Sequence, residues 1–340
     1  MSRETVVITG GGTGGHLSVA RAFLEEFHKR DIDVVFIGST YGQDKLWFEN
    51  ESKLKDAIFL ETTGVVNKGF FGKFVALFKI IKGVKKVLDT FKKYNITKVI
   101  SVGGFSAAAA SFGSFLGKKE LYIHEQNAHI GKLNQLSSKY AKEFFSSYHD
   151  ISKVKDYPIN SEFFKNSRIK TKIDSVIFLG GSQGAQAINE FAIKVAPILA
   201  KMDIKIIHQT GKTQFSDIKK RYKDLGIESE VFDFSKDILS KMAKADFAVS
   251  RSGASTLWEL VALGTPTLFI PYPYAAGDHQ YHNAKFIEDK KLGYILKQDE
   301  LTKEMFLEIL ENIQLEDKSK KLQQMISPDG VKSMVDLILN

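Results

Sequence analysis

The sequence predicts an α/β protein made of two Rossmann-like domains in tandem. Short runs rich in β-branched residues alternate with longer amphipathic stretches, which is typical of parallel βαβ units. A strand, a glycine-rich turn and a small-residue helix occur twice, as VVITGGGTGGHLSVA from Val6 and as VIFLGGSQGAQAIN from Val176. A chain of 340 residues is long enough for two domains, each with its own core.

Four strands are predicted in each half of the chain. They are TVVIT, DVVFIG, KVISVGG and ELYIH in the first half, and SVIFLGG, IKIIHQ, FAVS and TLFIP in the second. Between the halves, DYPINSEFFKNSRIKTKID loses its periodicity and gains charge, which indicates a linker and a domain boundary near Asn160. After SPDG at Ser327 the pattern predicts a short amphipathic helix that packs back on the first domain. The predicted domains are residues 1–160 with 327–340, and residues 161–326.

The composition excludes several classes of protein. Hydrophobic residues make up 43% and charged residues 26% of the chain, as in ordinary globular proteins. The chain has no cysteine, which excludes disulfides, thiolate metal sites and a cysteine nucleophile, and fits a reducing cytoplasm. No run of about 18 apolar residues is present to span a membrane. The first apolar stretch of the sequence is followed at once by glycines, so it lacks the long apolar core of a signal peptide.

The glycine loops predict phosphate binding. Gly10, Gly12 and Gly15 satisfy G-x-G-x-x-G, in which glycine lets backbone N–H groups approach an anion at a helix N-terminus. A nicotinamide cofactor would need an acidic residue at the end of the second strand, but DVVFIGST ends in Gly38, Ser39 and Thr40. Two more junctions of this kind, SVGGFSAAAA and SRSGASTLWE, favour a ligand with more than one phosphate.

Six motifs, in order, carry a resemblance to a known family. They are GGTGGH, VGGFSA, HEQN, GGSQGAQAIN, RSGASTLWE and DHQYHNA, between Gly11 and Ala284. Together they resemble the MurG family, the UDP-N-acetylglucosamine transferases that convert lipid I to lipid II in peptidoglycan synthesis. The resemblance implies the two-domain GT-B architecture, with the acceptor handled by the first domain, the UDP-sugar by the second, and the active site in the cleft between them. The alternative is another GT-B lipid glycosyltransferase, such as a diacylglycerol glycosyltransferase.

The resemblance also implies donor-binding residues in the second domain. Residues at two helix starts would meet the UDP part, Glu259 would accept hydrogen bonds from the ribose, and Gln280 with His279 and Asn283 would read the sugar hydroxyls. The helix-start residues are Ser182, Gln183, Gly184, Arg251, Ser252, Gly253, Ser255 and Thr256. One departure concerns Asn160, which stands where the family often has an arginine.

In the first domain the resemblance implies contacts to the acceptor and to the sugar. The residues concerned are Thr13, Gly14, Gly15, Gly103, Gly104 and Asn127. An inverting displacement also needs a base for the attacking hydroxyl, and the sequence leaves His16 and Glu125 as alternatives. No cofactor is expected. No metal is expected either, because the only D-x-D match, Asp31-Ile32-Asp33, has no third ligand cluster near it in the sequence.

A basic, aromatic segment predicts a membrane contact. Residues 67–93 carry eight lysines and one acid, with six apolar residues interleaved at helical spacing: Phe70, Phe71, Phe74, Leu77, Phe78 and Ile81. Such a helix suits an anionic bilayer surface, and an acceptor anchored in lipid favours a peripheral protein on the cytoplasmic face of the bacterial membrane. The net charge of +8 brings no nucleic-acid-binding motif with it, so nucleic acid is not an expected partner.

Overall fold

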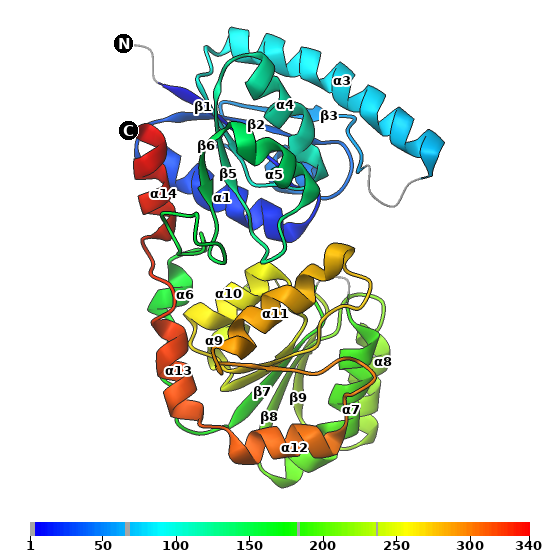
Figure 1. Ribbon diagram of the computed structural model, residues 1–340. Coiled ribbons are helices and arrows are strands. Elements are labelled where there is room, and N and C mark those ends of the chain that lie inside the picture. Colours follow the sequence, from blue (N-terminus) through cyan, green and yellow to red (C-terminus); the bar gives the residue numbers. More distant parts are fainter. Residues whose placement is uncertain (1–3, 65–68, 182–183, 236) are drawn as a thin grey trace. The chain divides into compact units, whose positions relative to one another are not determined.

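The computed structural model describes residues 4–64, 69–181, 184–235 and 237–340 (Figure 1). The chain divides into two compact units, Met1–Ile159 with Pro328–Asn340 (the first unit) and Asn160–Ser327 (the second unit). Each unit holds one six-stranded sheet with helices packed around it, and all strand pairs are parallel. The predicted fold class, two Rossmann-like α/β domains, is therefore confirmed.

The elements of the first unit follow the alternation read from the sequence. Its strands are β1 (Thr5–Thr9), β2 (Asp33–Ser39), β3 (Asp56–Leu60), β4 (Lys98–Ser101), β5 (Glu120–His124) and β6 (Ala141–Phe145). Its helices are α1 (Gly14–Lys29), α2 (Asp44–Phe48), α3 (Phe70–Lys93), η1 (Phe105–Ala107), α4 (Ala108–Leu116), α5 (Lys132–Ser137), η2 (Ser138–Tyr140) and α14 (Gly330–Leu339).

The second unit repeats the plan. Its strands are β7 (Ser175–Leu179), β8 (Lys205–Gln209), β9 (Ser229–Phe232), β10 (Phe247–Ser250), β11 (Thr267–Phe269) and β12 (Tyr294–Ile295). Its helices are α6 (Glu162–Lys165), α7 (Gln186–Lys201), α8 (Phe215–Asp224), α9 (Ile238–Lys244), α10 (Ala254–Ala262), η3 (Ala276–Asp278), α11 (His279–Asp289), α12 (Lys303–Asn312) and α13 (Leu315–Gln323).

The two sheets share one topology. The strand orders are β3-β2-β1-β4-β5-β6 and β9-β8-β7-β10-β11-β12. Successive strands are therefore added towards one edge of the sheet up to β3 or β9 and towards the opposite edge from β4 or β10 onward, with the switch between β1 and β4 in one sheet and between β7 and β10 in the other. In open α/β sheets, ligands bind outside the carboxyl ends of the strands at this switch point. All four loops that start at these strand ends carry glycine. The topology therefore brings the predicted glycine motifs together in pairs.

Helix α14 returns to the first unit, where it packs on α1. Met334, Val335 and Ile338 are buried there. The Tyr122 hydroxyl donates to the Ile338 carbonyl oxygen at 3.2 Å, and Arg30 Nη1 lies 2.6 Å from Asp336 Oδ1. The amphipathic pattern after Ser327 thus belongs to a helix that covers the first unit.

Helix α3 is apolar on two sides in its first half. Ala76, Ile80, Val84, Val87 and Phe91 recur every three or four residues and are buried on the side of the helix that packs into the first unit, where α3 contacts α4. A second set, Phe71, Phe74, Val75, Leu77, Phe78 and Ile81, is exposed. The side chain of Phe70 lies outside the described ones. The apolar set predicted from the sequence is therefore additional to the residues that form the core.

Candidate active site

The glycine loops after β1 and β4 lie against each other at the switch point of the first unit. The Gly11 amide donates to the Gly103 carbonyl oxygen at 3.1 Å. Gly103 and Gly104 have φ values of +86° and +78°, and a Cβ on Gly104 would lie 2.2 Å from the Gly11 oxygen. Glycine is required here by both conformation and space. Two motifs that lie about 90 residues apart in the sequence thus meet in one place, and they include the predicted residues Gly103 and Gly104.

A buried carboxylate lies beneath the first glycine loop. Asp44 is fully buried and accepts hydrogen bonds from the Gly12 amide and, at 2.8 Å, from the Ser39 amide. Burial is the largest influence on this carboxyl group and raises its pKa. The sequence predicts that the amides of this loop face a substrate phosphate, but the Gly12 amide is already bound to a side chain of the protein.

His16 is held from both sides of its ring. Thr13, at the N-cap of α1, places Oγ1 2.9 Å from His16 Nδ1, and the amide nitrogen of Gln126 lies 2.8 Å from His16 Nε2. The ring packs over Gly103, whose added Cβ would lie 3.4 Å from it. Gly14 and Gly15 open the same helix. The structure therefore brings Thr13, His16 and Gly103 together.

Glu125 is a buried carboxylate surrounded by donors. Its Oε1 accepts from the Asn127 amide at 3.0 Å, and its Oε2 accepts from the Gly131 amide and from Asn134 Nδ2, both at 2.9 Å. These bonds fix the loop that follows β5, including Asn127. This geometry suits a residue that shapes the loop better than one that takes a proton from a substrate.

In the second unit the loops after β7 and β10 also meet, since the Arg251 amide donates to the Leu179 carbonyl oxygen at 3.2 Å. Gly184 has a φ of +80°, and a Cβ there would lie 2.5 Å from the Thr210 oxygen. Gly253 is the N-cap of α10. Ser182 and Gln183, predicted to contact the UDP part, lie outside the described residues.

The side chain of Arg251 is bound within its own unit. Nη1 donates to the carbonyl oxygens of Ile270 and Pro271 at 2.9 and 3.0 Å, and Nη2 donates to Gln298 Oε1. Burial lowers the pKa of the guanidinium. These contacts fix the chain after β11, so a contact from Arg251 to a diphosphate stays a prediction.

Predicted residues on α10 and α11 differ in how open they are. Ser255, Thr256, Glu259, His279 and Gln280 keep some exposure. Gln280 Oε1 accepts from the Tyr272 amide at 3.0 Å, and His279 Nδ1 lies 3.0 Å from the Ala276 oxygen.

Two other predicted residues are fully buried. They are Ser252 and Asn283, and Asn283 Nδ2 donates to the Ser252 carbonyl oxygen at 3.1 Å. They fix the contact between the start of α10 and α11.

Glu259 titrates in an unusual range. Burial raises its pKa from the ordinary 4.5 to about 7. The folded protein therefore favours the neutral form of the Glu259 carboxyl group. The contribution of this group to the free energy of unfolding is complete below pH 4.5 and is lost as the pH rises through about 7.

We expect Glu259→Gln to stabilise the protein relative to the wild type at pH 8 but not at pH 4.5. At pH 8 the free energy of unfolding of the variant should exceed that of the wild type by about 2 kcal/mol, a value that is reduced because Glu259 is partly exposed to solvent. Urea denaturation at several pH values measures it, with the exposed Glu49→Gln as control. A difference that does not change with pH would contradict the assignment.

Four residues near these loops were not predicted: Asp44, Gln126, Asn134 and Tyr157. Gln126 lies within the HEQN motif, so that motif was the one signal available. The other three residues bind partners in the loops that lie 9 to 32 positions away in the sequence: Asp44, Asn134 and Tyr157. Such contacts depend on the fold and leave no local pattern.

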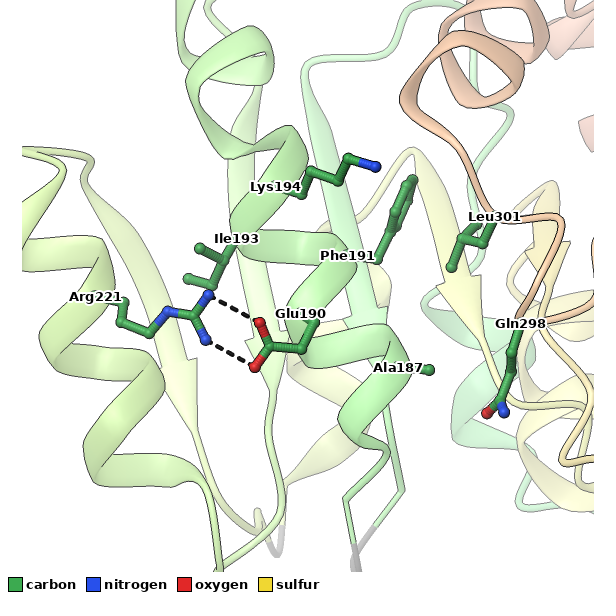
Figure 2. Close-up of a pocket in the computed structure, with 8 residues that line it drawn as sticks. All are labelled: Ala187, Glu190, Phe191, Ile193, Lys194, Arg221, Gln298 and Leu301. Atoms are coloured by element: carbon green, nitrogen blue, oxygen red, sulfur yellow. Dashed lines mark hydrogen bonds and ion pairs between the residues drawn. The ribbon is translucent and has the colours of Figure 1, made fainter.

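A hollow of about 350 Å³ opens on the second unit (Figure 2), and its lining includes Gln298, the acceptor of Arg251 Nη2. It lies beside α7, where Arg221 and Glu190 form a bidentate ion pair at 2.8 and 2.9 Å. No predicted site residue lines it. In the described part of the chain, no group of three histidine, aspartate or glutamate side chains could hold a metal ion.

Comparisons with known proteins agree with the topology. Residues 6–146 match the glycosyltransferase family 28 N-terminal domain, and residues 175–338 match the glycosyltransferase family 28 C-terminal domain. Two relatives carry the name UDP-N-acetylglucosamine--N-acetylmuramyl-(pentapeptide) pyrophosphoryl-undecaprenol N-acetylglucosamine transferase. The protein from Sulfurimonas denitrificans is 49% identical over 98% of each chain. That from Campylobacter jejuni subsp. doylei is 47% identical over 99% of this chain and 98% of the relative.

The chain belongs to the MurG family. It is therefore a glycosyltransferase enzyme, as the six motifs predicted. The crystal structure of Acinetobacter baumannii MurG superposes with a TM-score of 0.80 at 26% identity, covering 99% of both chains. A glycotransferase of kitacinnamycin, at 10% identity and a TM-score of 0.71, shares the fold. The glycine loops described above thus belong to a MurG-family enzyme.

Proposed function

We propose that this enzyme transfers N-acetylglucosamine from UDP-N-acetylglucosamine to the C4 hydroxyl of the N-acetylmuramyl unit of lipid I, giving lipid II for peptidoglycan synthesis. The hydroxyl oxygen bonds to C1 of the sugar, the C1–O bond to UDP breaks, and the hydroxyl proton passes to a base. Attack from the face opposite UDP inverts the configuration at C1. The proposal rests on sequence identities of 47% and 49%, along almost the whole chain, to two relatives whose names describe this transfer.

The second unit would hold the donor. The N-terminus of α10 presents backbone N–H groups and the side chains of Ser255 and Thr256, which suit a diphosphate. Glu259, further along the same helix, would accept hydrogen bonds from the ribose. Gln280 and His279, at the start of α11, would read the sugar hydroxyls, because an unpaired hydroxyl in a dry site costs about 1–3 kcal/mol.

The first unit would hold the acceptor, with His16 as the base. The three donors around Glu125 favour it as the residue that fixes the loop. His16 stands at the start of a helix beside the exposed Thr13, and imidazole suits proton transfer near neutral pH. Gly14, Gly15, Gly103, Gly104 and Asn127 would line the acceptor side.

The charge on the leaving UDP would be stabilised by helix N-termini rather than by a metal ion. The one D-x-D match supports this, because Asp33 Oδ2 is bound to Lys55 Nζ at 2.7 Å and Asp31 lies in the turn after α1 with a φ of +57°.

Acceptor-dependent release of UDP tests the reaction. Purified enzyme receives UDP-N-acetylglucosamine and a lipid I analogue, with and without EDTA. Release that needs the acceptor and resists EDTA supports the proposed reaction. Release that needs diacylglycerol instead would favour the alternative lipid glycosyltransferase, and EDTA-sensitive release would contradict the metal-free mechanism.

We also propose that α3 binds the cytoplasmic face of the bacterial membrane. Phe71, Phe74 and Phe78 are 85%, 69% and 67% exposed, and the helix carries lysines along its length. Among the described residues, no helix is long and apolar enough to cross a bilayer. Aromatic side chains inserted at the headgroups, with about 1 kcal/mol from each nearby lysine, would hold the enzyme where its lipid-linked acceptor lies.

We expect the triple variant Phe71→Ser, Phe74→Ser, Phe78→Ser to bind vesicles of phosphatidylglycerol and phosphatidylethanolamine at least about tenfold more weakly, because it loses apolar insertion. Co-sedimentation measures the binding, and higher salt should weaken the wild type. Ile151→Ser, which replaces an equally exposed apolar residue of the first unit, is the control. Unchanged binding of the triple variant would contradict the proposal.

A further inference from the structure

The hydrogen bonds of His16 determine which of its ring nitrogens carries the proton. The amide nitrogen of Gln126 can only donate, and it lies 2.8 Å from His16 Nε2. Nε2 must therefore accept. In the neutral ring the proton is then on Nδ1, which donates to Thr13 Oγ1 at 2.9 Å.

A second contact orients the Gln126 amide. Tyr157 is buried, and its hydroxyl donates to Gln126 Oε1 at 3.4 Å. The Tyr157 ring also packs edge-on against His124, with ring centroids 5.4 Å apart. Gln126 itself is only 6% exposed. The amide is thus enclosed, with its oxygen towards Tyr157 and its nitrogen towards His16.

We infer that Gln126 is a positioning residue that holds His16 as the Nδ1–H tautomer and keeps Nε2 as its basic nitrogen. The inference rests on the proposed function in one respect, since it gives the atom of the proposed base that takes the proton. The attacking hydroxyl would replace the Gln126 amide at Nε2 and transfer its proton there, leaving an imidazolium whose Nδ1–H stays on Thr13. That proton then leaves to solvent after UDP departs.

Three titratable groups lie on the elements that supply the contacts of this ring: His124 at the end of β5, Glu125 directly after it, and Asp44, which binds the Gly12 amide in the loop before α1. His124 is buried, which lowers its pKa to about 3 and keeps it neutral. Glu125 and Asp44 are held by backbone amides. Gln126→Glu leaves all three groups in the protein, so a changed tautomer of His16 would report the loss of the amide contact.

The test uses the full chain with ¹⁵N-labelled histidine. Long-range ¹H–¹⁵N correlation spectra report the tautomer and the pKa of each imidazole, and a His16→Gln variant assigns the His16 signal. The wild type should show His16 protonated on Nδ1. Gln126→Glu replaces the donor with a negative acceptor, so protonation of Nε2 and an upward pKa shift of about 1 unit or more are expected. In a plot of kcat against pH, the acid limb should move to higher pH together with this pKa.

Two further variants keep the test decisive. Tyr157→Phe removes only the hydroxyl that orients the amide, so a mixture of both tautomers is expected, even if Gln126→Glu fails to fold. Gln135→Glu makes the same charge change at an exposed site on α5 and should leave the His16 signal unchanged.

Two results would overturn the inference: wild-type His16 protonated on Nε2, or a tautomer and pKa unaffected by Gln126→Glu. If the tautomer and the pKa of His16 change as expected but the dependence of kcat on pH does not move, the positioning role of Gln126 holds and the role of His16 as the base is wrong. The spectra decide the positioning role, and the rates decide the proposed function.

Discussion

Replacing His16 with alanine is expected to lower the turnover number by about 10²–10⁴-fold, the usual contribution of a general base. The KM for UDP-N-acetylglucosamine should change little, because the residues proposed to hold the donor lie in the second unit. The rate of UDP release at saturating donor and acceptor measures the effect. Addition of imidazole to the variant should restore part of the rate if the ring acts chemically.

His28→Ala is the matched control, since His28 is an exposed histidine near the other end of the same helix. Its turnover should equal that of the wild type. Near-normal turnover of His16→Ala would remove His16 from the proposed role and leave the base to another group.

Replacing Glu125 with alanine is expected to destabilise the first unit by about 3 kcal/mol. The change removes the acceptor of the Asn127 and Gly131 amides, which are partly open to water, and of the buried Asn134 Nδ2, and an unsatisfied buried group costs about 1–3 kcal/mol. Urea denaturation followed by tryptophan fluorescence measures the loss. In a Trp258→Phe background, Trp47 is the only tryptophan and reports the first unit.

Glu49→Ala, at an exposed glutamate of the same unit, should stay within about 0.5 kcal/mol of its parent. If Glu125→Ala kept its stability and lost its turnover, Glu125 would act in the chemistry and the loop-fixing role would be wrong. Comparing Glu125→Ala with Glu49→Ala in both stability and turnover thus distinguishes a structural role of Glu125 from a catalytic one.

The central strands of both sheets could be predicted from the sequence, but four edge strands could not. The eight predicted strands are all present, whereas β3, β6, β9 and β12 were not predicted. Central parallel strands are buried on both faces and appear as continuous apolar runs. Strands such as β9 (SEVF) and the two-residue β12 are partly exposed, so their sequences carry no such run.

The four glycine loops could be predicted from the sequence for a similar reason. Glycines next to a strand end mark a tight turn locally, so the four loops could be found from the sequence. What binds their amides is decided by the fold: Asp44 reaches Gly12 across 32 residues, and Gln126 reaches His16 across 110. Sequence patterns placed the loops correctly but could not show that Gly12 is already bound to a carboxylate.

The return of α14 to the first unit has a consequence for synthesis of the chain. The ribosome must make all of Asn160–Ser327 after Ile159 before it reaches Pro328, which takes roughly ten to thirty seconds at bacterial to eukaryotic elongation rates. During that interval the face of α1 that later receives Met334, Val335 and Ile338 has no cover from α14. The unit whose translation begins first can therefore complete its fold only after Pro328–Asn340 has been made, and until then its nascent form leaves this face of α1 without α14.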